Sequence, residues 1–230
     1  MNIFALSTDP SVAARMMCDK HIPKMIVESA QMMASAIRRH QDSVLSRYED
    51  EGYMSINELF AHRGIVTKKG FPYVGGYKNH PCTVWAGDNW TNFMWLARHA
   101  KELLVEFSQR YGSNLVQHAC TEPVMAMHRI GRKMYRHQKA GVNKTPFAMA
   151  MPDKYKRAGK EVLAYRHYYY AEKAHFAKWE RGRARPDWWT MQLAAEQQTQ
   201  ERSGGYFAYD GDRYRFYAET GGDDIDDLFG

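Results

Sequence analysis

The amino-acid sequence predicts a mainly helical protein, built as a single helical domain with a small C-terminal β-hairpin and an acidic tail. Apolar residues recur at spacings of three and four along several long segments, which is the period of an amphipathic helix. The 230 residues, of which 44% are hydrophobic, are enough for one substantial domain, and no internal repeat divides them. A strand pattern occurs only near the C-terminal end, so the helical class is the prediction.

Three helices are predicted in the first half of the chain. A short one begins with Asp9 as its N-cap and Pro10 in its first turn. The second runs from about His21 to His40 and buries a stripe of Ile, Met and Ala side chains. The third covers roughly residues 83–110, while residues 41–80 are mixed, with loops marked by Gly, Pro and Asn.

The second half begins with a helix near residues 122–138, capped by Thr121, that becomes strongly basic toward its end. A proline-punctuated extended link, 143–156, precedes a helix at about 157–180. A short helical stretch near 188–201 then leads to an Asp-Gly pair between two aromatic-rich runs, which is a strong hairpin pattern. We therefore divide the chain into a helical domain over 1–189, a helix-and-hairpin appendage over 190–220 and an acidic tail over 221–230.

The chain is basic, with a net charge of +6 and an isoelectric point near 9.1. Its last ten residues hold four Asp and no Lys or Arg, so the rest of the chain has a net charge of +10. Such a body favours polyanionic partners, although it also suits a merely soluble basic protein. No apolar run approaches the roughly 18 residues of a membrane span. The N-terminus lacks a signal-peptide pattern, and the three cysteines fit reduced thiols, so we expect a soluble cytoplasmic protein.

A file of polar side chains lines the edge of the buried face on the second predicted helix. His21, Lys24, Glu28, Gln31 and Ser35 lie at i, i+3, i+7, i+10 and i+14. A glutamate near a His and a Lys can act as a general base, or can stabilise positive charge at a reacting sugar or amine. The alternative is structural, because Lys24 and Glu28 have the i, i+4 spacing of an ordinary helix ion pair.

A second candidate site is the segment YKNHPCTVWAGDNW, where a loop meets the third predicted helix. It is dense in polar and aromatic residues, which often mark a pocket. The alternative is a structural loop in which Pro81 opens the helix. The residues predicted to contact substrate or DNA in this segment are Asn79, His80, Trp85, Asp88 and Asn92.

Aromatic and basic residues alternate in the segment YRHYYYAEKAHFAKWERGRARPDWW. Aromatic rings that stack on bases, combined with cations that bind phosphates, hold unpaired bases in many proteins. The helical spacing of these aromatics predicts that most of them are core and that the cations are on the surface. The DNA-binding candidates are Arg166, Tyr169, Lys173 and Lys178. No nucleotide-binding or zinc motif is present, so neither a metal nor another cofactor is predicted.

The segment MCDKHIPKMIVESAQMMASAIRRH resembles the N-terminal helix of the phage pyrimidine-dimer DNA glycosylases known as endonuclease V. That family has Asp-Gln-His followed by a catalytic Glu seven residues after the His; here Asp19-Lys20-His21 is followed by Glu28. The segment YRHYYYAEKA is similar to a Tyr-rich basic stretch near the C-terminus of that enzyme. The NIF, NHP, AMPD and EKA segments are also similar to a broad group of phage-encoded proteins, over about residues 2–189.

The resemblance implies a helical catalytic domain like that of endonuclease V, which acts on a flipped-out base in duplex DNA. By position, Glu28 becomes the catalytic carboxylate, with His21 and Lys24 as catalytic neighbours facing the DNA. Asn2 and Gln31 are predicted to contact the DNA beside them. In that family the N-terminal amine of a processed Thr attacks C1′ of the nucleotide. This chain begins with Met and Asn, so the motif alone does not support an amine nucleophile.

Three functions are compatible with these residues. The favoured one is transfer of a free amino acid onto an activated, phosphorylated 5-hydroxymethyluracil in phage duplex DNA, by analogy with hypermodified thymidines. The first alternative is a pyrimidine or pyrimidine-dimer DNA glycosylase with AP lyase activity. The second is a non-enzymatic DNA- or replisome-binding protein that docks a protein partner through the acidic tail Asp223–Phe229, unless that tail is only a solubilising end. A phage-encoded protein would act in the host cytoplasm.

Overall fold

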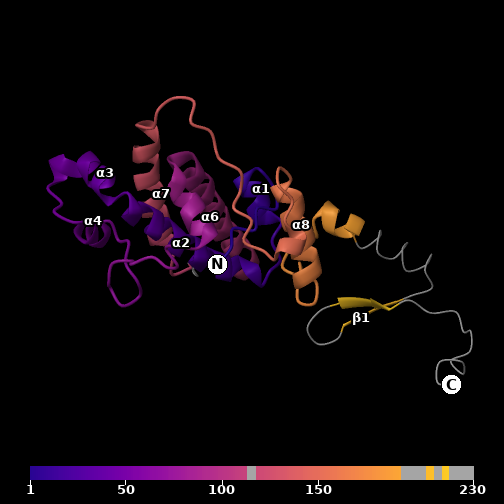
Figure 1. Cartoon of the computed structure of the whole chain (residues 1–230). Helices are drawn as coiled ribbons and strands as arrows, with labels where there is room; N and C mark the ends of the chain where they lie inside the picture. The colour runs from indigo at the N-terminus through magenta and orange to yellow at the C-terminus, as the bar shows by residue number, and fades with distance from the viewer. Residues whose placement is uncertain (113–117, 193–205, 210–213, 218–230) are drawn as a thin grey trace, which may run out of the picture.

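The computed structural model describes residues 1–112, 118–192, 206–209 and 214–217 of the chain. Three long helices form the centre of the fold and lie side by side (Figure 1): α2 (His21–Arg39), α6 (Trp90–Tyr111) and α7 (Thr121–Arg136). Each packs against the other two through side chains that are almost completely buried. The mainly helical class predicted from the apolar periodicity is confirmed.

Two shorter helices pack against this centre. α1 (Pro10–Arg15) begins as predicted, since the Asp9 carboxylate accepts a hydrogen bond from Val12 N at 2.8 Å and Pro10 occupies the first turn. α1 lies against α6, and α5 (Pro81–Asp88) lies against both α2 and α6. The N-terminus of α5 is thereby brought next to the middle of α2.

The single helix predicted over residues 83–110 is in fact two helices. Asn89 lies between α5 and α6 with an extended backbone, φ −158° and ψ 164°, which ends the first helix. Its side-chain oxygen accepts a hydrogen bond from Asn92 N at 2.9 Å and so caps the second helix. Because buried residues continue on both sides of the break, the apolar pattern did not reveal it.

The remaining helical elements cover the ends of the central helices. The mixed segment 41–80 contains α3 (Gln41–Leu45), the 3₁₀ helix η1 (Ser46–Glu51) and α4 (Ile56–His62). Later in the chain, η2 (Asp153–Tyr155) precedes α8 (Glu161–Lys173), which is shorter than the helix predicted over 157–180. Thr121 is the first residue of α7 rather than its cap. A further helical stretch covers residues 187–192.

Two four-residue strands, β1 (Tyr206–Tyr209) and β2 (Tyr214–Tyr217), pair in antiparallel fashion, with Tyr206 opposite Tyr217. Residues 210–213 between them lie outside the described residues, as do residues 193–205 and the predicted acidic tail. The small hairpin, the appendage and the three-part division of the chain therefore stay predictions.

A buried ion-pair network ties the start of α2 to the end of α6. The Arg110 side chain is 0% exposed, and its guanidinium lies 3.0 Å from Asp19 Oδ1 and 2.6 Å from Glu106 Oε2. It also donates hydrogen bonds to the backbone oxygens of Met17 and Arg15. Because a buried charge is tolerated only when it is paired and hydrogen-bonded, these contacts fix how the two helix ends meet.

The aromatic residues of α8 and the segment after it lie mainly in the core, as predicted. Tyr165 and Tyr169 are completely buried, and Tyr170 and Trp179 nearly so. All three cysteines are buried free thiols. Within the described residues, no helix combines the length and apolar character that crossing a membrane requires.

Candidate active site

The carboxylate of Glu28, in the middle of α2, lies beside the start of the chain. Its Oε2 accepts a hydrogen bond from Asn2 N at 2.8 Å and lies 3.8 Å from the α-amino nitrogen of Met1. The other oxygen, Oε1, lies 3.7 Å from Lys24 Nζ. The side chains of Glu28 and Met1 are 15% and 1% exposed, whereas that of Lys24 is 64% exposed. Glu28 is therefore flanked by two primary amines: the α-amine of Met1, whose side chain is buried, and the exposed ammonium of Lys24.

Hydrogen bonds fix the first residues of the chain in this position. Asn2 Nδ2 donates to Ala150 O at 2.8 Å, and Asn2 Oδ1 accepts from the backbone nitrogens of Ile3 and Phe4 at 2.8 and 2.9 Å. Phe4 has a φ of 36°, a left-handed conformation that costs a non-glycine residue about 1–3 kcal/mol. Asn2, predicted to contact DNA, is 6% exposed and instead holds the Met1 amine near Glu28.

A loop with two glycines closes one side of the site. Ser35 Oγ accepts a hydrogen bond from Gly76 N at 2.9 Å and donates one to Gly76 O at 3.2 Å. Gly75 has a φ of +83°, and a Cβ on it would lie 2.2 Å from Ser35 Oγ, so only glycine fits this close approach. A Cβ on Gly76 would lie 3.2 Å from Met1 Cε and 3.4 Å from Gln31 Cδ. The loop thus covers the Met1 side chain, with Gln31 against it.

The N-terminus of α5 borders the site as well. His80 Nδ1 accepts a hydrogen bond from Cys82 N at 3.2 Å and so caps α5. Burial and then the positive charge of the Met1 amine lower the pKa of His80, while the charge of Glu28 opposes this shift. Burial raises the pKa of the Cys82 thiol to about 11. His80 is therefore a neutral imidazole near neutral pH, close enough to the amine and the carboxylate to respond to both charges.

His21 lies in the core, not on the DNA-facing surface that the resemblance implied. It is 4% exposed, its Nδ1 lies 2.7 Å from Tyr169 OH, and its ring stacks on Phe4 with centroids 4.9 Å apart. Burial, followed by the charges of Lys24 and Lys173, lowers the pKa of His21 to about 3. The physical reason is tertiary, because residues from α8 cover the first turn of α2. His21 links α8 to the strained start of the chain.

Three further candidates are core residues. Trp85 is 3% exposed, and Asn92 and Tyr169 are completely buried. The Asn92 amide donates to Trp85 O and to Thr145 Oγ1, both at 2.8 Å, and its oxygen accepts from Thr145 N at 3.0 Å. These contacts tie the extended link over 143–156 to the helical bundle. The structural alternative for this segment therefore describes Trp85 and Asn92.

The remaining candidates lie at or near the surface. Lys173 is half-buried and lies 5.1 Å above the Tyr168 ring, and its charge acts on His21 together with that of Lys24. Arg166 Nε donates to Leu6 O at 2.9 Å. The other candidates, which are exposed, are Asn79, Asp88 and Lys178. In the described part of the chain no contact joins them to Glu28, and Lys178 pairs with Glu180 at 3.3 Å.

Two features of the site were not predicted from the sequence: the position of the Met1 amine at Glu28, and the Ala150 carbonyl that holds Asn2. Both depend on contacts between residues that are far apart in the chain. One signal was available, since Asn2 is a polar residue next to the apolar run IFAL, and buried polar side chains need hydrogen-bond partners. Among the described residues, no group of three His, Cys, Asp or Glu side chains is arranged to hold a metal ion.

A carboxylate beside a primary amine places a proton acceptor next to a potential nucleophile, an arrangement that can let an amine react. The model of the family described as pyrimidine dimer DNA glycosylase matches residues 1–117, a segment that includes Met1, Lys24, Glu28 and His80. The chain therefore belongs to the pyrimidine dimer DNA glycosylase family, which confirms the resemblance seen in the α2 segment and indicates an enzyme that acts on DNA. No match was found among curated proteins or among solved structures.

Proposed function

We propose that this protein removes a damaged or modified pyrimidine base from DNA, with the Met1 α-amine as nucleophile and Glu28 as the proton acceptor. The observation that supports this proposal is the 3.8 Å separation between the amine nitrogen and Glu28 Oε2. The same oxygen accepts a hydrogen bond from Asn2 N at 2.8 Å. Family membership supports DNA as the substrate. α-Amino groups in general lose their proton at lower pH than lysine amines, which favours them as nucleophiles near neutral pH.

The proposed reaction takes place at C1′ of a nucleotide flipped out of the duplex. The neutral Met1 nitrogen forms a bond to C1′ while the bond from C1′ to the base breaks, and the base leaves with the electron pair and takes up a proton from solvent water. Glu28 accepts the proton that the nitrogen releases. The C1′–O4′ bond then breaks, O4′ gains the proton from Glu28, and an iminium remains between C1′ and the nitrogen. Water or β-elimination resolves this iminium.

The other residues of the site take supporting roles in this proposal. Lys24 offers a second amine beside Glu28, but its side chain is 64% exposed, and we assign it to phosphate binding together with Lys173. Asn2 and the loop at Gly75–Gly76 hold the start of the chain in place. His80, which is neutral near neutral pH and responds to the charges of the Met1 amine and Glu28, is assigned a hydrogen bond to the departing base.

Transfer of an amino acid onto phosphorylated 5-hydroxymethyluracil, which the sequence alone favours, lacks a supporting observation among the described residues. Such a reaction needs a pocket for the amino acid. The segment around Trp85, which the sequence predicts to mark a pocket, is instead joined to the 143–156 link in core packing by Asn92. The glycosylase reaction uses the amine–carboxylate pair without any co-substrate, and for this reason we place it first.

Intact masses of duplex oligonucleotides, measured after incubation with the protein, test the proposal. The panel contains thymine, 5-hydroxymethyluracil, its phosphorylated form and a cyclobutane pyrimidine dimer, each with and without mixed amino acids. We expect loss of a base or strand scission on at least one duplex, slowed about 100-fold or more by Glu28→Gln. A mass gain that requires an amino acid would instead establish the transferase, and unchanged masses throughout would leave a DNA-binding protein.

Glu58→Gln is a matched control for the loss of the carboxylate. Glu58 on α4 also accepts a backbone hydrogen bond at 2.8 Å, from Met54 N, but it lies outside the site. This control is expected to keep the wild-type rate. A second variant carries two extra residues ahead of Met1, which removes the α-amine from Glu28 while every side chain of the site stays. Wild-type base release by that extended protein would rule out the Met1 amine as nucleophile.

A further inference from the structure

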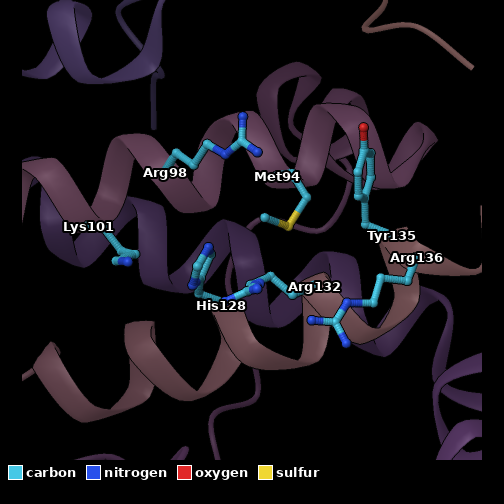
Figure 2. A pocket seen from close by; sticks show the side chains of 7 residues that line it. All are labelled: Met94, Arg98, Lys101, His128, Arg132, Tyr135 and Arg136. Carbon is cyan, nitrogen blue, oxygen red and sulfur yellow. The ribbon is translucent and has the colours of Figure 1, made fainter.

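A hollow of about 430 Å³ lies between α6 and α7 and shares no lining residue with the site at Glu28. Figure 2 shows its basic side chains, with Arg98 and Lys101 coming from α6 and Arg132 and Arg136 from α7. The whole of α7 lies outside the segment 1–117 that matches the family. Half of this surface is therefore not accounted for by the family match.

The basic side chains of this hollow have no acidic partners. Arg98, Arg132 and Arg136 are exposed, and within the described residues neither they nor Lys101 form an ion pair or a side-chain hydrogen bond. On α7 the spacing i, i+3, i+7 brings Arg129, Arg132 and Arg136 to one side of the helix. Positive charges gathered without counter-charges create a potential that attracts anions.

Two neighbouring hollows extend the first into one trough. The hollow on one side, of about 370 Å³, shares Arg98 and Tyr135 with it and adds Lys144. The hollow on the other side, of about 360 Å³, shares Arg132 and Arg136 and adds Arg129, Lys133 and Arg63. We call these three adjoining hollows the α6–α7 trough.

The acidic residues among those that line the trough are already engaged. They are Asp9, which accepts the capping hydrogen bond from Val12 N, and Glu51, which is paired with Arg63. The remaining cations of the trough are thus left to face solvent or a ligand. Lys133 lies 3.6 Å above the Tyr48 ring, which orients its ammonium group without neutralising it.

His128 lines the trough and is acted on by the charges of its cations. Burial, followed by the charges of Lys101, Arg132, Arg98 and Arg129, lowers the pKa of His128 to about 4. These four cations come from both helices, and all of them act on one imidazole. A phosphate bound among them would offset their charges, so the pKa of His128 would rise on binding.

We infer that the α6–α7 trough binds the phosphodiester backbone of a DNA strand, as a contact surface separate from the site at Glu28. A linear polyanion fits better than a small anion, because the cations extend over three adjoining hollows instead of converging on one point. From Arg129 to Arg136 the helix rises about 10 Å, close to three nucleotides of a duplex strand. The exposed ring of Tyr135 adds a surface on which a base can stack.

This inference rests on the proposed action on DNA but not on the amine chemistry, so the two can fail separately. The test is the salt dependence of binding to an undamaged duplex, measured by fluorescence anisotropy for the wild type and for the triple variant Arg98→Gln, Arg132→Gln, Arg136→Gln. Each phosphate contact contributes about 0.9 to the slope of log K against log salt. The triple variant is expected to lower the magnitude of the slope by about two to three, with the single-turnover rate at saturating substrate DNA unchanged.

A control variant removes the same charge from other exposed sites: Arg47→Gln, Lys69→Gln and Arg185→Gln, all without ion pairs among the described residues. We expect the slope of log K against log salt for this control to differ from that of the wild type by no more than about one. An equal loss in both variants, or a wild-type slope in the trough variant, would overturn the inference. The inference would also be overturned if the protein bound phosphatidylserine vesicles more tightly than DNA and the trough variant lost that vesicle binding. An upward shift of the His128 titration on DNA binding, followed by NMR, is the second expected result.

Discussion

Acidification is expected to destabilise the protein through His21, whose folded-state pKa of about 3 lies far below the ordinary value of 6.5. A histidine with a depressed pKa binds fewer protons in the folded than in the unfolded state, so its contribution is complete above pH 6.5 and is lost as the pH falls toward 3. pH 4 lies about 2.5 units below the ordinary pKa and still above the folded-state pKa, so at about 1.4 kcal/mol per unit His21 alone removes about 3 kcal/mol of stability there. That is a large fraction of the stability of an ordinary domain.

The assay is urea unfolding at several pH values between 7 and 4, compared between the wild type and His21→Asn, which retains a polar group near Tyr169. His99 and His128, whose pKa values are lowered to about 4, also weaken the folded state in acid, but they are common to both proteins. The difference between the two curves therefore isolates His21, and it is expected to shrink by about 3 kcal/mol from pH 7 to pH 4. If the unfolding free energies of the two proteins changed with pH in parallel, the burial of His21 as a neutral imidazole would be refuted. It would also be refuted by a variant of wild-type stability that has lost base release about 100-fold.

Three further outcomes are expected. Arg110→Leu removes the buried partner of Asp19 and one of the two guanidinium partners of Glu106, which keeps Arg183, and is expected to cost about 3–5 kcal/mol in urea unfolding; a loss below about 1 kcal/mol would contradict the role given to the network. Gly131→Ala would place a Cβ 2.2 Å from Cε1 of the buried Phe93 ring, so we expect a loss of about 1–3 kcal/mol despite the better helix propensity of alanine. Adding Phe93→Leu to that variant should recover part of the loss, and no recovery would point away from the steric clash. Deletion of residues 221–230, which removes four negative charges, should leave base release unchanged, and loss of activity would assign the tail a part in catalysis.

Local sequence patterns predicted the parts of the fold that depend on neighbours in the chain. The cap of α1 at Asp9, the extent of α2 and the existence of α7 follow from capping residues and apolar spacing. The break at Asn89 was missed because it interrupts the backbone but not the succession of buried residues. The pairing of Arg110 with Asp19 was missed as well, since it joins side chains 91 positions apart.

The candidate site could be predicted only where its residues share one helix. Lys24, Glu28 and Gln31 belong to the same file on α2, and the structure keeps them together. His21 belongs to the same file but is buried, because Tyr169 of α8, 148 positions later in the chain, lies over it. Helical periodicity shows which residues share an edge, whereas only the tertiary packing decides which part of that edge is covered.

The most direct test of the central claim is to trap the iminium with borohydride during reaction with a substrate duplex and to locate the modified residue by mass spectrometry. The account predicts a covalent adduct between protein and DNA on the α-nitrogen of Met1, formed by the wild type and reduced about 100-fold or more in Glu28→Gln. An adduct on Lys24, or base release without any adduct, would contradict it.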